Sequence, residues 1–211
     1  MSAPLRYTLV GDGPSDRCLL PIINWALGQI EGVREFGFIP QVADPRDPQA
    51  AGSGLAERVR QAVRVNPCDL LFIHRDAEKE PLEKRVAEIR QASRGELPPH
   101  VPVVPVRMTE AWLLIEEKAI RSAADNPNGE APLPLPLIRR LESIADPKRA
   151  LRECLLSASG KKGRRLDQFR RDLPGRVYRV AELIEDFTPL RSLSAFRRFE
   201  EAVRTAVSPR P

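Results

Sequence analysis

Residues 69–78, Asp-Leu-Leu-Phe-Ile-His-Arg-Asp-Ala-Glu, are the most informative segment of the chain for its fold. Its first half, 69–73, predicts a strand that is apolar on both faces, as in central strands of parallel sheets covered by helices on both sides. Charged residues follow directly where this strand ends. Because ligands of parallel α/β sheets bind beyond the carboxyl ends of the strands, we expect residues 74–78 to lie at a functional edge.

On both sides of this segment, strands and helices alternate along the first half of the chain. Apolar runs predict further strands at 5–10, 36–43 and 101–106, separated by helices that start near residues 15, 54 and 81. This alternation predicts an α/β fold: a mostly parallel four-stranded sheet flanked by helices, with a helical C-terminal extension.

Residues 122–136, rich in Pro, Asn and Ala, predict a loop between two parts of the chain. We expect an α/β domain at 1–121 and a basic helical subdomain at 137–207. Helices of the second part are expected near 137–143, 147–157, 175–185 and 193–206.

Composition limits the cellular setting. The chain has 211 residues, of which 42% are hydrophobic and 30% charged, and no apolar run approaches the ~20 residues that span a bilayer. Cys18, Cys68 and Cys154 form no CxxC pair and are odd in number, which favours a reducing cytoplasm and argues against a structural zinc site. We therefore expect a cytoplasmic protein with no membrane partner, and the sequence is compatible with a homodimer.

Charge is distributed unevenly. Residues 1–130 hold 16 Lys and Arg against 19 Asp and Glu, whereas residues 131–211 hold 18 against 10, for net charges of −3 and +8. This asymmetry favours an acidic chemical half and a basic half that attracts a polyanion. A solvated, Arg-rich surface explains the charge equally well.

Carboxylates follow three of the predicted strands. Asp12 and Asp16 come after the first strand, Asp76 and Glu78 after the third, and Glu110 after the fourth. Gathered carboxylates repel one another and imply a compensating cation, and oxygen ligands without a Cys/His set suit Mg²⁺ or Mn²⁺. We expect Asp12, Asp16, Asp76 and Glu78 to bind the metal.

Each of these signals has a simpler interpretation. Residues 11–14, Gly-Asp-Gly-Pro, are also a plain turn sequence, and Asp76 and Glu78 are also ordinary loop carboxylates. Glu110 stands near Trp112, an expected core residue, where a carboxylate is costly without a partner. His74 is expected to pack or hydrogen-bond beside the site. The functional hypothesis therefore depends on the joint arrangement.

The motifs at these strand ends resemble those of the Toprim superfamily, which topoisomerases, DnaG-type primases and overcoming-lysogenization-defect nucleases share. Residues 9–16, Leu-Val-Gly-Asp-Gly-Pro-Ser-Asp, resemble its first motif, with Asp12 where glutamate is usual. Residues 72–78, Phe-Ile-His-Arg-Asp-Ala-Glu, resemble its Asp-x-Asp motif, with Glu78 in the last position. The shorter side chain of Asp12 is the main departure from the family pattern.

A closer resemblance is to small prokaryotic Toprim-like proteins with a Glu-Ala-Trp-Leu-Leu signature. It is carried by residues 106–114, Val-Arg-Met-Thr-Glu-Ala-Trp-Leu-Leu, and by the stretches 160–165 and 194–199. Members of this family are frequently encoded with an ABC/SMC-type ATPase in defence operons. The resemblance implies a Toprim-like fold, a Mg²⁺-dependent nuclease in antiviral defence, and an ATPase partner.

On this resemblance, the expected catalytic residues are Asp12, Asp76, Glu78 and Glu110. Asp76 and Glu78 would bind Mg²⁺, Asp12 would complete the site or position water, and Glu110 would bind a second ion or act as a base. Backbone phosphates of DNA or RNA would bind a basic cluster whose alternative is a solvated helix face. The cluster consists of Lys161, Lys162, Arg164, Arg165, Arg170 and Arg171.

Other functions fit the sequence less well or remain open. A non-catalytic Toprim-like subunit that binds an ATPase or nucleic acid is the alternative to a nuclease. A nucleotide-hydrolysing enzyme is disfavoured because the chain has no Gly-x-x-x-x-Gly-Lys-(Ser/Thr) loop. A covalent topoisomerase is disfavoured because Tyr7 and Tyr178 are the only tyrosines and neither lies in a recognisable strand-passage domain.

Overall fold

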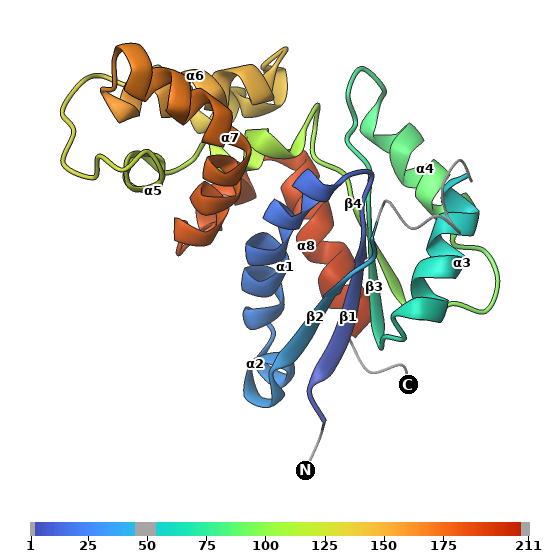
Figure 1. Cartoon of the computed structure of the whole chain (residues 1–211). Helices are drawn as coiled ribbons and strands as arrows, with labels where there is room; N and C mark the ends of the chain where they lie inside the picture. Colours follow the sequence, from blue (N-terminus) through green and yellow to red (C-terminus); the bar gives the residue numbers. More distant parts are fainter. Residues whose placement is uncertain (1–2, 45–53, 208–211) are drawn as a thin grey trace.

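A parallel sheet with strand order β2-β1-β3-β4 is the centre of the fold (Figure 1). The computed structural model describes residues 3–44 and 54–207 of the chain. Adjacent strands pair in parallel throughout, so the predicted α/β class and its four-stranded sheet are confirmed. The strands are β1 (Leu5–Val10), β2 (Phe38–Val42), β3 (Leu70–His74) and β4 (His100–Val103).

Helices cover both faces of the sheet. On one face lie α1 (Leu19–Gly28) and α2 (Glu31–Phe36), which follow β1, together with the C-terminal α8 (Ser194–Val207). On the other face lie α3 (Leu55–Val65) and α4 (Leu82–Ala92), which precede and follow β3. The chain crosses from β1 to β2 on one side and returns past β1 to β3, so the strand order reverses between β1 and β3.

The two faces bury different residues of the same strands, because successive side chains of a strand point to opposite faces. Leu9 and Phe72 belong to the hydrophobic cluster that includes α1 and α8. Val10, Leu71 and Ile73 belong to the cluster that includes α3 and α4. All five residues of β3 are buried, which is the physical reason for the apolar run in the sequence.

The second half of the chain extends beyond the carboxyl edge of the sheet before it returns (Figure 1). The α5, α6 and α7 helices pack against one another, and η1 and η2 connect them to the sheet. The remaining elements are η1 (Pro14–Cys18), η2 (Thr109–Leu113), α5 (Glu117–Ala123), η3 (Ile138–Ser143), α6 (Pro147–Ser159), α7 (Gly163–Leu183) and η4 (Thr188–Ser192).

The last helix of the predicted 137–207 subdomain packs on the sheet. Phe199 of α8 contacts Phe72 of β3, with ring centroids 6.3 Å apart, and Trp112 of η2, with centroids 5.7 Å apart. Phe196 packs edge-on to Trp112 at 5.2 Å. The helical C-terminal part therefore shares a hydrophobic core with the sheet of the 1–121 part.

Several boundaries differ from those that the sequence predicts, among them those of α7 and β4. The helix predicted at 175–185 begins at Gly163 and runs through Pro174. Burial of Phe169, Leu173 and Val180 along one side of α7 outweighs the local cost of the proline. The strand predicted at 101–106 ends at Val103, because the chain turns away through Pro105 to Arg107, whose φ is 61°.

No helix in the described parts of the chain is long and apolar enough to cross a membrane. Cys18, Cys68 and Cys154 are all free thiols, and Cys18 and Cys154 are buried.

Candidate functional site

The loop after β1 is closed by Asp16. Its Oδ2 accepts hydrogen bonds from the backbone N–H groups of Asp12, at 2.7 Å, and Gly13, at 3.0 Å. A Cβ atom at Gly11 would lie 2.6 Å from the same oxygen, so only glycine fits there without a shift. The loop thus holds the carboxylate of Asp16 at the carboxyl edge of the sheet, where the strand order reverses and ligands of such sheets bind.

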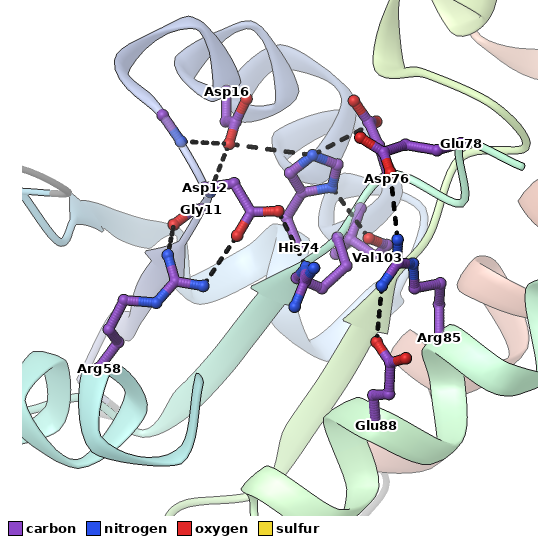
Figure 2. A network of polar contacts seen from close by, with 12 residues as sticks. Gly11, Asp12, Asp16, Arg58, His74, Asp76, Glu78, Arg85, Glu88 and Val103 are labelled. Atoms are coloured by element: carbon purple, nitrogen blue, oxygen red, sulfur yellow. Dashed lines mark hydrogen bonds and ion pairs between the residues drawn. The ribbon is translucent and has the colours of Figure 1, made fainter. Parts of the chain in front are cut away.

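Asp12 is paired with two arginines (Figure 2). Arg58 of α3 lies 2.8 Å from its Oδ1, and Nε of Arg75 lies 2.9 Å from its Oδ2. Arg58 also donates a hydrogen bond to the carbonyl oxygen of Gly11, at 3.2 Å. The two arginines therefore neutralise the charge of Asp12 within the chain. A carboxylate that binds a metal ion would be neutralised by the ion and would not need such partners.

His74 is buried at the centre of the site, with 1% of its side chain exposed. Its Nδ1 lies 3.0 Å from the carbonyl oxygen of Val103 and donates to it, because a carbonyl can only accept. The other nitrogen, Nε2, faces Asp76 Oδ1 at 3.5 Å, Thr109 Oγ1 at 3.4 Å and Asp16 Oδ2 at 3.9 Å. Figure 2 shows the ring between these groups and the end of β4. His74 thus packs beside the site, as the sequence predicts, and connects the two carboxylates.

Asp76 is held by Thr109 on the neighbouring loop. Its Oδ1 accepts hydrogen bonds from the backbone N–H of Thr109, at 2.9 Å, and from its hydroxyl, at 3.2 Å. Burial raises the pKa of Asp76 to about 6, and the charges of Glu110 and Asp16 add to this effect, whereas His74 and the Thr109 backbone oppose it. Its second oxygen, Oδ2, accepts no hydrogen bond within the described residues.

Glu110 is a third carboxylate in this region, near Asp76. It belongs to η2, next to the buried Trp112, and is itself only 9% exposed. No donor in the parts of the chain that the structure describes reaches its carboxylate. Burial raises the pKa of both Asp76 and the Cys18 thiol, and the charge of Glu110 adds to this effect, so the Glu110 carboxylate lies near both groups.

Glu78 has a different setting. It lies in the left-handed region, with φ of 53°, and its N–H donates to the carbonyl oxygen of Arg107, which is also left-handed. Its exposed carboxylate is 3.2 Å from Arg85, and the same guanidinium lies 2.9 Å from Glu88. Glu78 therefore has an arginine partner of its own.

Of the expected site residues, Asp16 and Asp76 lie at His74 Nε2, and Glu110 is close enough for its charge to raise the pKa of Asp76; these three carboxylates are the acidic group of the site. Asp12 and Glu78 instead pair with arginines. Within the described residues, no three His, Cys, Asp or Glu side chains stand ready to hold a metal ion. Asp12, Asp16, Asp76 and Glu78 thus do not form a ready ligand set, because two of them are engaged by arginines.

The residues of the expected basic cluster differ in their contacts. Lys161 is engaged by the fold, because its Nζ donates to the carbonyl oxygen of Ala124, at 3.1 Å, and lies over the Phe169 ring. Arg170 pairs with Asp167, and Arg171 donates to Gln168. Among the residues that the structure describes, Lys162, Arg164 and Arg165, at and near the start of α7, are exposed and make no such contact.

A cavity of about 480 Å³ adjoins Glu110, and the sequence alone does not indicate it. It is lined by Arg17 of η1, by Lys148 and Arg152 of α6, and by Tyr178 of α7. The only local signal is the i, i+4 spacing of Lys148 and Arg152, which places both on one side of a helix. A larger cavity of about 920 Å³ lies between α4, β4 and α8, but no acidic residue of the site lines it.

Comparisons with protein-family models, with curated proteins and with solved structures find no match. The fold and the site define an α/β protein with an acidic group at the reversal of strand order, beside a cation-lined cavity.

Proposed function

We propose that the chain is a Toprim-type, metal-dependent hydrolase of nucleic-acid phosphodiesters. The observation that carries this proposal is the approach of Asp16 and Asp76 to His74 at the edge of the sheet, with Glu110 nearby in the lining of a cavity that also holds Arg17, Lys148 and Arg152. Cationic side chains attract a phosphate, and acidic side chains recruit a divalent cation. The cytoplasm, antiviral defence and an ABC/SMC-type ATPase partner belong to the proposal through the resemblance of the sequence to Toprim-like proteins.

The acidic group fits Mg²⁺ or Mn²⁺ in its chemistry. Asp76 has a raised pKa because it is buried near two other carboxylates, and a bound cation would relieve this repulsion. Asp16, Asp76 and Glu110 would hold the ion, and their side chains would have to close around it. Such an ion would polarise the scissile phosphate and stabilise negative charge on the leaving oxygen.

Neighbouring residues of the chain would orient these carboxylates. Thr109 fixes one oxygen of Asp76 through two hydrogen bonds, which leaves the other oxygen free for a ligand. His74 is fixed by Val103 and presents one nitrogen to both Asp76 and Asp16. We assign His74 and Thr109 as positioning residues, because both are buried and face the carboxylates instead of the cavity.

A non-catalytic Toprim-like subunit is the second candidate. The observation that favours it is the pairing of Asp12 with Arg58 and Arg75, which occupies the residue that matches the glutamate of the Toprim motif. In this case the chain would bind nucleic acid or an ATPase partner without cutting.

Cleavage of labelled single-stranded and duplex DNA and RNA, with Mg²⁺, with Mn²⁺ and with EDTA, separates the two candidates. We expect metal-dependent cleavage by the wild-type chain and a loss of at least about 100-fold in Asp76→Asn, which keeps the shape but removes a charge. Asp172→Asn is the matched control, because Asp172 lies exposed on α7. Cleavage that survives in Asp76→Asn would refute the assigned site.

Binding of the ion is measured separately by thermal unfolding. A cation that binds only the folded chain stabilises it by about 2.7 kcal/mol at about 100 times its dissociation constant. We expect millimolar Mg²⁺ or Mn²⁺ to raise the melting temperature of the wild type and to leave Asp76→Ala nearly unchanged. Equal shifts in both proteins would place metal binding elsewhere. A wild-type chain that binds nucleic acid but never cuts it, alone or with a partner ATPase, would favour the binding subunit.

A further inference from the structure

We propose that the cavity beside Glu110 binds a terminal nucleotide that carries a phosphate monoester. This inference rests on the proposed function, since it names the part of a nucleic-acid substrate that would occupy the site. The cavity of about 480 Å³ lies within the range of about 300–1,000 Å³ that small-molecule sites occupy. Its lining comes from η1, η2, α6 and α7 and joins cationic, aromatic and acidic side chains.

The cations of this cavity are not paired with carboxylates, unlike several other basic residues of the fold. Arg58, Arg85 and Arg191 each form ion pairs with carboxylates at 3.2 Å or less. By contrast, the side chains of Arg17, Lys148 and Arg152 have no hydrogen bond or ion pair with any of the residues that the structure describes. Together these exposed cations give the cavity a positive rim, which attracts an anionic ligand.

The number of cations favours a monoester over a diester. Each internal phosphate of a nucleic acid carries one negative charge, whereas a phosphate monoester carries about −1.5 to −2 at pH 7 and presents three acceptor oxygens. Arg17, Lys148 and Arg152 offer three separate donors for these oxygens. A terminal phosphate therefore matches the charge and the donors better than an internal one.

The opposite part of the lining suits a nucleoside. Pro174, Val177 and the half-exposed Tyr178 give the cavity an apolar side, on which a base can stack at about 1–3 kcal/mol. Glu110 lacks a donor within the described residues and lines the same cavity, so it can accept from a sugar hydroxyl or a base amino group. Because Glu110 also belongs to the acidic group, a nucleotide in this cavity would place the next phosphodiester beside the proposed catalytic site.

Binding without divalent ions tests the inference independently of cleavage. The probes are fluorescent hexathymidylates with a 5′-phosphate, with a 3′-phosphate or with no terminal phosphate, and thymidine monophosphate as an unlabelled competitor, all in EDTA. We expect one phosphorylated oligonucleotide to bind at least about tenfold more tightly than the unphosphorylated one, because a charge-assisted contact is gained. Competition by thymidine monophosphate would show that the cavity binds a free nucleotide. Absence of competition would show that it binds only the end of a strand.

Two matched pairs of variants localise the effect. Arg152→Gln should remove the phosphate preference and weaken binding of the phosphorylated probe about 10- to 100-fold, because a hydrogen bond to a charged group is lost. Arg149→Gln on the same helix is the control, since Arg149 is exposed, pairs with Glu153 and does not line the cavity. Tyr178→Ala should weaken binding of all probes about tenfold through the lost stacking, and Tyr178→Phe, which keeps the ring, should restore binding.

The outcomes separate this inference from the proposed function. Equal binding of phosphorylated and unphosphorylated probes, or equal losses in Arg152→Gln and Arg149→Gln, would overturn the inference even if the chain cleaves nucleic acid. A phosphate preference that Arg152→Gln abolishes would support it even if no cleavage is found, and the proposed function would then fail alone.

Discussion

Asp76→Asn gives a direct test of the electrostatics of the site through the pH dependence of folding. Burial, with Glu110 and Asp16 nearby, raises the pKa of Asp76 from its ordinary 3.8 to about 6. Between these values the folded chain binds more protons than the unfolded chain, so the raised pKa costs stability as the pH increases through this range. The amide that Asp76→Asn introduces keeps an acceptor for Thr109 and has no charge to desolvate.

The size of the effect follows from the separation of the two pKa values. At about 1.4 kcal/mol per pH unit, a separation of about two units corresponds to about 3 kcal/mol. Because 31% of the Asp76 side chain is exposed, solvent screening reduces this figure, and we expect about 1–2 kcal/mol. The free energy of unfolding of Asp76→Asn, relative to that of the wild type, should therefore rise by this amount between about pH 4 and pH 6.5.

Urea unfolding at several pH values, with EDTA present throughout, measures this difference. Asp125→Asn gives a contrast of opposite sign, because a hydrogen bond from Arg176 lowers the pKa of Asp125. That variant should be destabilised at neutral pH, and its deficit should shrink as the pH falls below about 4. A relative stability of Asp76→Asn that stays constant or decreases over the same range would show that His74 and Thr109 stabilise the Asp76 carboxylate more than burial destabilises it.

Three further predictions concern the loop, the basic cluster and the core. Gly11→Ala should cost about 1–3 kcal/mol in urea unfolding, because its Cβ would overlap the carboxylate that closes the loop, whereas Gly32→Ala, with open space around it, should change stability by less than about 1 kcal/mol. Lys161→Ala should lower the melting temperature more than Lys162→Ala, because Lys161 contacts the fold. Lys162→Ala should instead reduce the slope of log affinity for duplex DNA against log salt concentration by up to about 0.9. The reverse order of these effects would show that Lys161, and not Lys162, binds the DNA. Phe199→Ala should cost about 3–5 kcal/mol in urea, and a loss below about 1 kcal/mol would contradict the packing of α8 on the sheet.

The sequence predicts the sheet well because its signals are local. The run at 69–73 is apolar on both faces, and β3 is buried on both faces. A strand with this pattern needs a helix on each side, so its sequence alone indicates the layers around it. The same logic predicts Asp16 and Asp76 at one edge, because parallel strands end together. The structure brings both within 3.9 Å of His74 Nε2.

The sequence does not predict which side chains pair when they are far apart along the chain, because only the tertiary fold brings them together. Asp12 and Arg58 are 46 residues apart, and no local pattern distinguishes this pair from other combinations of the many arginines and carboxylates. The same holds for Arg17 and Arg152, which meet at one cavity only because α6 packs beyond the sheet edge. Lys161 likewise belongs to a basic run in the sequence but contacts Ala124 and Phe169 in the fold.

The position of α8 has a consequence for how the chain is made. This helix covers the side of the sheet near β4 and contacts Phe72 and Trp112, yet about 90 residues separate it from the end of β4. During synthesis, this aromatic surface stays open until α8, which ends at Val207, has left the ribosome, and exposed apolar surface of nascent chains promotes aggregation. The core around Phe72 and Trp112 is therefore closed only after α8 has been synthesised.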